Sequence, residues 1–184
     1  MTTTRWLLNN LLQTRKRAAR TAVLCVLIGA VVGCGRKSPD LMTLTNSYDS
    51  PATLCQRVLV ALAACDTLAL ETIRITRFEH DSILVPHMPI GKDTTGHKDL
   101  ALAWYMLEQR NIKGIRRALA DYGGQRFELV SVKFNRPEEK YGHLIVHKGT
   151  EVRVRDAAGE EMVLGIFGSI LEQDGRYKLV SIRD

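Results

Sequence analysis

The stretch Gly123–Phe134, GGQRFELVSVKF, decides the fold class, because the periodicity of the sequence changes within it. Before this stretch, apolar residues recur at helical spacing, whereas after it apolar and polar residues alternate as in a β-strand. The glycine pair is typical of the end of a helix. FELVSVKF (Phe127–Phe134) is predicted to be the first strand, so helices precede a sheet.

Three more strands are predicted after the first one, separated by segments rich in turn residues. The separating segments are NRPEEKYG, DAAG and QDGR, and the last has the composition of a tight hairpin turn. The predicted strands are His143–Arg155, with a bend at Gly149, then Glu160–Glu172 and Tyr177–Arg183. Glu160–Glu172 is apolar on both faces, which places it in the middle of the sheet.

Two glycines, Gly165 and Gly168, interrupt the strand predicted over Glu160–Glu172. Glycine inside a strand is typical of a bulge or a sharp bend, and we favour that interpretation. The alternative is that the missing side chains open a cavity between the sheet and the helices. Trp104, Phe167 and Tyr177 are the candidate lining residues of such a cavity.

The helical part begins at Ser50-Pro51, a cap residue followed by the residue preferred in the first turn. Asp66 is a second cap, and we interpret it as such rather than as a catalytic acid. A third helix is predicted from about Asp99 to Tyr122. Between the second and third helices, Phe78–Asp99 is predicted to be a long irregular loop, because it contains two prolines and two glycines.

Helices followed by an antiparallel meander predict an α+β fold. The element order, and the helix broken within ALAACDTLALETI, resemble the cone-shaped fold of ketosteroid isomerases, polyketide cyclases and nuclear transport factor. This resemblance implies N-terminal helices packed on a curved four-stranded antiparallel sheet over residues 50–184. A cystatin-like domain is the alternative. No catalytic residue of the resembled enzymes maps onto this sequence, so the catalytic set is predicted to be empty.

The N-terminus has the pattern of a secretory signal peptide. Basic residues precede an uncharged run, AVLCVLIGAVV (residues 22–32), which is shorter than the ~20 apolar residues that span a membrane. Val31-Val32-Gly33-Cys34 resembles the lipobox of bacterial lipoproteins. The resemblance implies cleavage after residue 33 and acylation of Cys34. The polar composition that follows predicts a tether over residues 34–49, and the alternative is that Leu41, Met42 and Leu44 dock on the folded unit. The alternative is that Cys34 is a chance cysteine at the end of an uncleaved anchor.

Removal of this segment changes the charge of the chain. The whole sequence has a pI of about 9.3, but its first 33 residues hold five basic side chains and no acidic one. The remainder has 21 Lys and Arg against 20 Asp and Glu, a net charge of +1. A nearly neutral chain lacks the long-range attraction for phosphate backbones, so nucleic acid is excluded as a partner.

The sequence contains no motif for a metal, cofactor or nucleophile. His143 and His147 lie on one predicted strand, where this spacing separates the side chains by ~13 Å, too far apart to share a metal ion. Neither a metal site nor a cofactor is therefore predicted. Cys55 and Cys65 are ten residues apart on a predicted helix, which favours free, buried thiols over a disulfide.

These features predict a non-enzymatic lipoprotein of the cell envelope, anchored to a membrane through Cys34. Gly35 at the next position favours the outer membrane in a cell that has two. The expected ligand is a protein partner or a small apolar molecule. The alternatives are a small enzyme of the isomerase or cyclase type and an accessory subunit of an envelope assembly.

Overall fold

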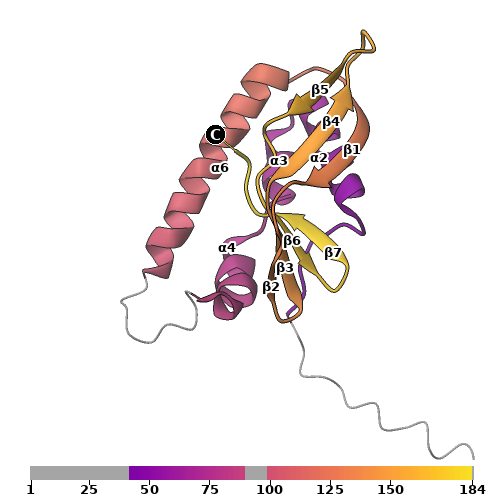
Figure 1. The fold of residues 1–184 in the computed structure, drawn as a ribbon. Coiled ribbons are helices and arrows are strands. Elements are labelled where there is room, and N and C mark those ends of the chain that lie inside the picture. The colour runs from indigo at the N-terminus through magenta and orange to yellow at the C-terminus, as the bar shows by residue number, and fades with distance from the viewer. Residues whose placement is uncertain (1–41, 90–98, 184) are drawn as a thin grey trace, which may run out of the picture. The chain divides into compact units, whose positions relative to one another are not determined.

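A computed structural model describes residues 42–89 and 99–183 of the 184-residue chain. The predicted signal peptide and Cys34 lie outside the described residues. Residues 42–184 cluster as one compact unit, and its described part is an α+β structure, as predicted (Figure 1). Its helical elements are α2 (Pro51–Ala63), α3 (Thr67–Thr72), α4 (Arg77–Glu79), the π-helix η1 (His80–Leu84), the 3-10 helix η2 (Val85–His87) and α6 (Leu100–Tyr122). Its strands are β1 (Glu128–Phe134), β2 (Glu139–Tyr141), β3 (Leu144–His147), β4 (Thr150–Arg155), β5 (Glu161–Leu164), β6 (Ile170–Gln173) and β7 (Arg176–Leu179).

These strands form two antiparallel sheets, with the orders β1-β4-β5 and β2-β3-β6-β7 (Figure 1). The single four-stranded meander expected from the sequence is therefore replaced by two sheets. Two predicted strands are each divided between them: His143–Arg155 becomes β3 and β4, and Glu160–Glu172 becomes β5 and β6. The first division falls at Gly149, whose φ of +68° favours glycine and turns the chain out of the sheet.

The hairpin and the position of the apolar strand test two finer predictions. Asp174 and Gly175 connect β6 to β7 with φ values of 51° and 75°, which is the geometry of a tight hairpin turn, as predicted. The expectation that Glu160–Glu172 lies in the middle of a sheet holds for β6 but is wrong for β5, which is an edge strand. The predicted turn over residues 135–142 also contains the short strand β2.

The helix boundaries agree with the two caps predicted from the sequence, Ser50 and Asp66, and with the predicted start of the third helix at about Asp99. The side chains of Ser50, Asp66 and Asp99 accept hydrogen bonds from the backbone N–H groups of the first turns of α2, α3 and α6, at 2.9–3.1 Å. Asp66 is thus a helix cap, as we interpreted it. Within residues 42–89 and 99–183, no helix combines the length and the apolar character needed to cross a membrane.

The segment predicted as an irregular loop is largely helical. Thr76 and Glu79 form a reciprocal capping box that starts α4, and the chain then continues through η1 and η2. Pro86 lies in the first turn of η2, where a backbone N–H is not needed for the helix. Proline therefore did not exclude helix here, and the prediction of a loop is wrong for the described residues up to His87.

The two cysteines differ in their surroundings. Both are free, as the sequence favoured, and Cys55 is buried in α2. Burial raises the pKa of the Cys55 thiol to about 12, so it is an inert core side chain. Cys65 is exposed, contrary to the expectation of two buried thiols, because α2 ends at Ala63 and residue 65 lies in the turn that follows.

The sheet β2-β3-β6-β7 separates two hydrophobic cores. Neighbouring residues of one strand point to opposite faces of a sheet, and Ile170 and Leu171 accordingly belong to different cores. The larger core is formed by α2, α3, α6 and both sheets. The smaller core is formed by η1 and the other face of the four-stranded sheet, together with Leu44 from the N-terminal segment.

The N-terminal residues 42–49 pack on the folded unit, which agrees with the alternative that apolar residues of the predicted tether dock there, whereas residues 34–41 lie outside the described residues. Leu44 is buried, and its backbone N–H donates to Oε1 of Gln173 at 2.9 Å. The Gln173 side-chain amide in turn donates to the carbonyl of Met42 at 2.7 Å. Tyr48 and Tyr177 exchange two backbone hydrogen bonds of 2.9 and 2.7 Å, which add a bridge to the edge of β7.

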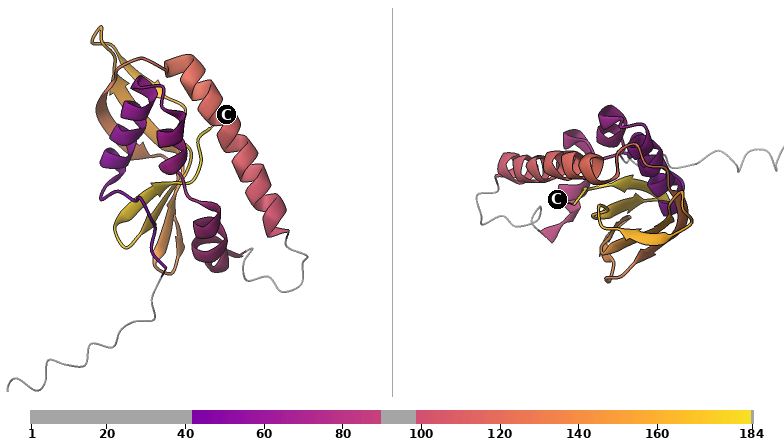
Figure 2. Two further views of the ribbon diagram at one scale, coloured as in Figure 1. Left: turned by 180° about the vertical axis from the view of Figure 1, so that it is seen from behind. Right: turned by 90° about the horizontal axis from the view of Figure 1, so that it is seen from above.

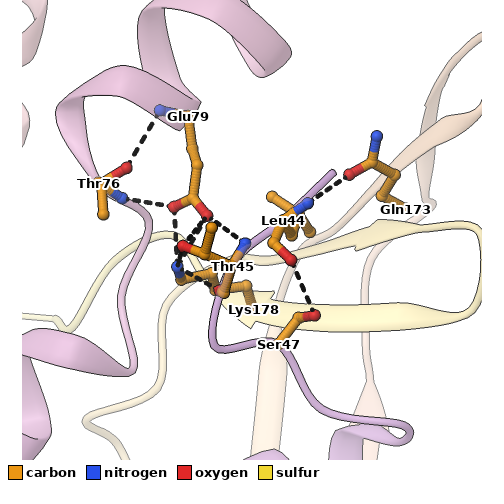
Figure 3. A network of polar contacts seen from close by, with 7 residues as sticks. All are labelled: Leu44, Thr45, Ser47, Thr76, Glu79, Gln173 and Lys178. Atoms are coloured by element: carbon orange, nitrogen blue, oxygen red, sulfur yellow. Dashed lines mark hydrogen bonds and ion pairs between the residues drawn. The ribbon is translucent and has the colours of Figure 1, made fainter. Parts of the chain in front are cut away.

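A buried ion pair between Lys178 and Glu79 holds this segment in place (Figure 3). Lys178 is 0% exposed and Glu79 is 1% exposed. The ammonium of Lys178 donates to both carboxylate oxygens, at 2.9 and 2.8 Å, and to the carbonyl of Thr45 at 2.6 Å. The backbone N–H groups of Thr45 and Thr76 each donate to the same carboxylate at 2.7 Å. The pair therefore connects three segments that are far apart in the sequence.

The protonation of Glu79 reflects two opposing effects. Burial alone raises the pKa of its carboxyl group, but donation from Lys178 and from the backbone N–H groups of Thr76 and Thr45 outweighs burial and holds the pKa below its ordinary value. Because the folded-state pKa is lowered, this contribution to stability is complete above the ordinary carboxyl pKa. It is lost as the pH falls through the lowered value.

We expect Lys178→Met to lower the free energy of unfolding at pH 7 by about 3–5 kcal/mol, because it leaves the Glu79 carboxylate buried without its counter-ion. Urea unfolding of the full chain measures this. The matched control is Arg77→Ala, which removes an exposed i,i+4 pair with Asp81 and should cost about 1 kcal/mol or less. Equal losses in the two variants would show that the buried pair has no special weight.

Candidate functional site

The strongest candidate site lies where the chain passes from one sheet to the other. A hollow of about 600 Å³ opens between this junction and α6. It is lined by the segments that follow β1, β3 and β7, by the segment before β6, and by one turn of α6. The lining residues are Arg110, Arg136, Lys148, Gly149, Gly168, Ser169, Ser181 and Arg183. The site therefore forms because the chain segments that connect the two sheets meet at this place.

Two glycines, Gly149 and Gly168, line this hollow at positions where chain segments pass close to each other. A side chain at Gly149 would lie 2.9 Å from Cγ of Arg136, and one at Gly168 would collide with the hydroxyl and carbonyl oxygens of Ser181. Gly168 instead donates its N–H to the Ser181 carbonyl at 3.0 Å, and its own carbonyl accepts from the Thr150 hydroxyl at 2.6 Å. The predicted bulge or bend within one strand is not what the structure has: Gly168 lies in the connection between β5 and β6, where it allows direct backbone contact with Ser181.

The hollow is strongly basic. Arg110, Arg136 and Arg183 are exposed, and within residues 42–89 and 99–183 none of their guanidinium groups forms an ion pair or a side-chain hydrogen bond. Lys148 is paired with Glu139 at the rim. Among the described residues, those that line the hollow include no Asp or Glu. Positive charge therefore gathers at one place on a folded unit whose described residues contain equal numbers of basic and acidic side chains.

This set of groups has the chemistry of an anion receptor. Guanidinium groups donate paired N–H bonds to carboxylate and phosphate oxygens, and serine hydroxyls at Ser169 and Ser181 add further donors. A cation would be repelled by the same groups. Phosphate, sulfate or carboxylate is the ligand class that the arrangement can bind.

The three residues predicted to line a cavity do not line this hollow. Phe167 is 1% exposed and packs in the larger core, and Tyr177 packs half-buried against the same core. Trp104 on α6 lies against the ring of His80, with centroids 5.4 Å apart. They act as packing residues at separate places, and the structure does not bring them together round one cavity.

The histidines are dispersed as well. His143 contacts the ring of His87, whereas His147 stacks on Phe134 with ring centroids 4.3 Å apart and lies 2.7 Å from a carboxylate oxygen of Glu172. In the described part of the chain, no three His, Cys, Asp or Glu side chains are grouped so that they could hold a metal ion.

No protein-family model, curated protein or solved structure matches this chain. The geometry of the basic hollow is therefore the basis for assigning it as a candidate site.

Sequence reasoning missed the four basic residues because nothing in their spacing connects them. They come from one helix, two inter-strand segments and the segment that follows β7, and only the break between the sheets brings them together. A partial signal was present in the alternative interpretation of Gly165 and Gly168, in which missing side chains open a cavity. Gly168 does line the hollow, whereas Gly165 does not, and neither glycine indicated its charge.

We expect Gly168→Ala to destabilise the fold by about 1–3 kcal/mol or more, because the new methyl group collides with Ser181 and forces the crossing segments apart. Gly165→Ala is the matched control, since a methyl group there meets no atom within 4 Å. Thermal unfolding of the two variants checks the difference. A Gly165→Ala variant that loses as much stability would contradict the assignment of Gly168 to the close contact.

Proposed function

We propose that this protein is a non-enzymatic lipoprotein of the cell envelope whose folded unit binds an anionic ligand in the basic hollow. The single observation that carries the binding role is the convergence of Arg110, Arg136, Arg183 and Lys148 on a space whose described lining has no carboxylate. The membrane anchor is the part of the proposal that comes from the sequence, on the lipobox-like Val31-Val32-Gly33-Cys34.

The clustering of charge supports a ligand because it is costly without one. Like charges that face one space repel each other, and solvent screens them only in part over distances shorter than about 8–10 Å. A bound anion removes this repulsion and gains hydrogen bonds from the same groups. The clustering of these basic residues therefore serves a negatively charged partner and not the stability of the fold.

The small apolar ligand expected from the sequence has less support. The more apolar hollow, of about 440 Å³, lies between α2 and the start of β1, against Leu59, Val60 and Phe127. Its lining contributes few polar groups to orient a ligand. An envelope protein partner that presents carboxylates or phosphates fits the basic hollow as well as a small anion does.

The enzyme alternative is not favoured by the acids near the described hollows. Asp121, beside a hollow of about 270 Å³, pairs with Arg117 at 3.6 Å. Asp156, beside another, accepts the backbone N–H groups of its own turn. These contacts account for the two carboxylates as a surface ion pair and a turn, so neither gives positive support to a general base. The relation to the cone-shaped fold with a curved four-stranded sheet stays a proposal, supported by helices that precede antiparallel strands.

We expect the full chain in detergent to bind inorganic phosphate or sulfate, and Arg136→Ala and Arg183→Ala each to raise the Kd about tenfold, because each removes charge-assisted hydrogen bonds. Isothermal titration calorimetry measures the binding. Arg155→Ala is the matched control, since Arg155 is exposed and already paired with Glu128 and Glu161. Binding that is absent, or lost equally in all three variants, would refute the anion site.

We expect the mature chain purified from membranes to begin at an acylated Cys34, and Cys34→Ser to abolish both the modification and membrane retention. Mass spectrometry of the N-terminal peptide and fractionation of the cells measure the two effects. A chain that keeps Met1 and stays in the membrane would instead show an uncleaved anchor. This result is independent of anion binding, so either half of the proposal can fail alone.

A further inference from the structure

Contacts on one side of α6 fix which face of this helix is free. Its buried residues are Asn111, Gly114, Ile115 and Ala118. A side chain at Gly114 would lie 2.6 Å from the Ile182 carbonyl oxygen, so glycine allows the C-terminal segment to pass close to the helix. Asn111 accepts the Ile182 N–H at 2.8 Å. The C-terminal segment lies beside the middle of α6 in both views of Figure 2, and the helix cannot rotate about its axis without breaking these contacts.

The first two turns of α6 expose large apolar side chains on the opposite face. Leu102, Tyr105 and Met106 are 52%, 58% and 58% exposed, and their i, i+3, i+4 spacing places them next to each other. Exposing three large apolar side chains together on one helix face is unfavourable in water. Neighbouring exposed apolar side chains of this kind can contact another apolar environment.

The next turns of the same face are basic. Arg110, Lys113, Arg116 and Arg117 follow the apolar residues along the helix, and all four are exposed. In the described part of the chain, only Arg117 has an acidic partner, Asp121. Arg183 extends this basic surface beyond the helix, because it lines two hollows, one with Arg110 and the other with Arg117.

We propose that this face of α6 lies on an anionic lipid surface. Leu102, Tyr105 and Met106 would enter the boundary between headgroups and acyl chains, and the basic residues would contact lipid phosphates. An exposed face that combines apolar and basic side chains is complementary to such a surface in both respects. A nucleic acid would match the basic turns but not the apolar ones.

The inference goes beyond the proposed anion site, although the two share Arg110. The lipid contact uses residues that do not line the basic hollow, namely the apolar turns, Lys113 and Arg116. A lipid anchor at Cys34 would bring the helix to the surface but does not decide which face of the folded unit meets it. The orientation therefore has its own test.

The experiment places the photo-crosslinking residue p-benzoylphenylalanine at Tyr105 in the full chain. The matched control places it at Val163, an exposed apolar residue of β5 that is 43% exposed. Each protein is bound to vesicles of phosphatidylcholine, with or without phosphatidylglycerol. After irradiation, mass spectrometry counts lipid adducts per bound chain, so the result does not depend on how the chain is anchored.

We expect adducts at position 105 to exceed those at position 163 about tenfold in vesicles that contain phosphatidylglycerol. Lys113→Glu combined with Arg116→Glu should reduce them about tenfold, because it reverses the attraction of two basic residues for the anionic surface. Both residues are exposed, and an unchanged unfolding temperature confirms that the variant is folded. Equal adducts at the two positions, or cross-links to a second copy of the chain in place of lipid, would overturn the proposal.

Discussion

The buried pair of Lys178 and Glu79 is the interaction on which the rest of the structure depends. It joins the last strand, the start of α4 and the N-terminal residue Thr45 in one set of hydrogen bonds. Removing two charges from water costs several kcal/mol each, and only complete hydrogen bonding offsets this cost. The smaller core can form only when all three segments are in place together. The pair therefore specifies one arrangement of the chain more than it adds to the total free energy of folding.

The break between the sheets has a different physical origin, which is steric. Gly149 and Gly168 occupy positions where a Cβ atom would meet Arg136 or Ser181, so the chain can cross at these points and leave the first sheet. The crossing segments are short and polar, and they approach each other closely. Their charged side chains have no room in either core and project into the same hollow. The close crossing of the chain that divides the strands between two sheets therefore also brings the positive charges together.

The sequence predicted the local features of this protein better than the distant ones. The caps at Ser50 and Asp66, the start of a helix at about Asp99 and the turn at Asp174-Gly175 follow from a few neighbouring residues, and all four are in the structure. The division into two sheets could not be predicted, because it depends on contacts such as Gly168 with Ser181 rather than on periodicity. The basic hollow was missed for the same reason, since its residues meet only after the chain has crossed. The prolines and glycines that follow Glu79 also led to the prediction of a loop, although the capping box of Thr76 and Glu79 starts a helix there.

The position of β7 after all the other described strands has a consequence for the order of folding. This strand supplies Lys178 to Glu79, its backbone pairs with Tyr48, and Leu179 lies in the larger core. Neither core can close while β7 is still within the ribosome, since each needs residues from it or from its neighbour β6. The nascent chain thus keeps both cores open until β7 has left the ribosome. Folding of this unit therefore follows the synthesis of all the described strands and does not proceed strand by strand.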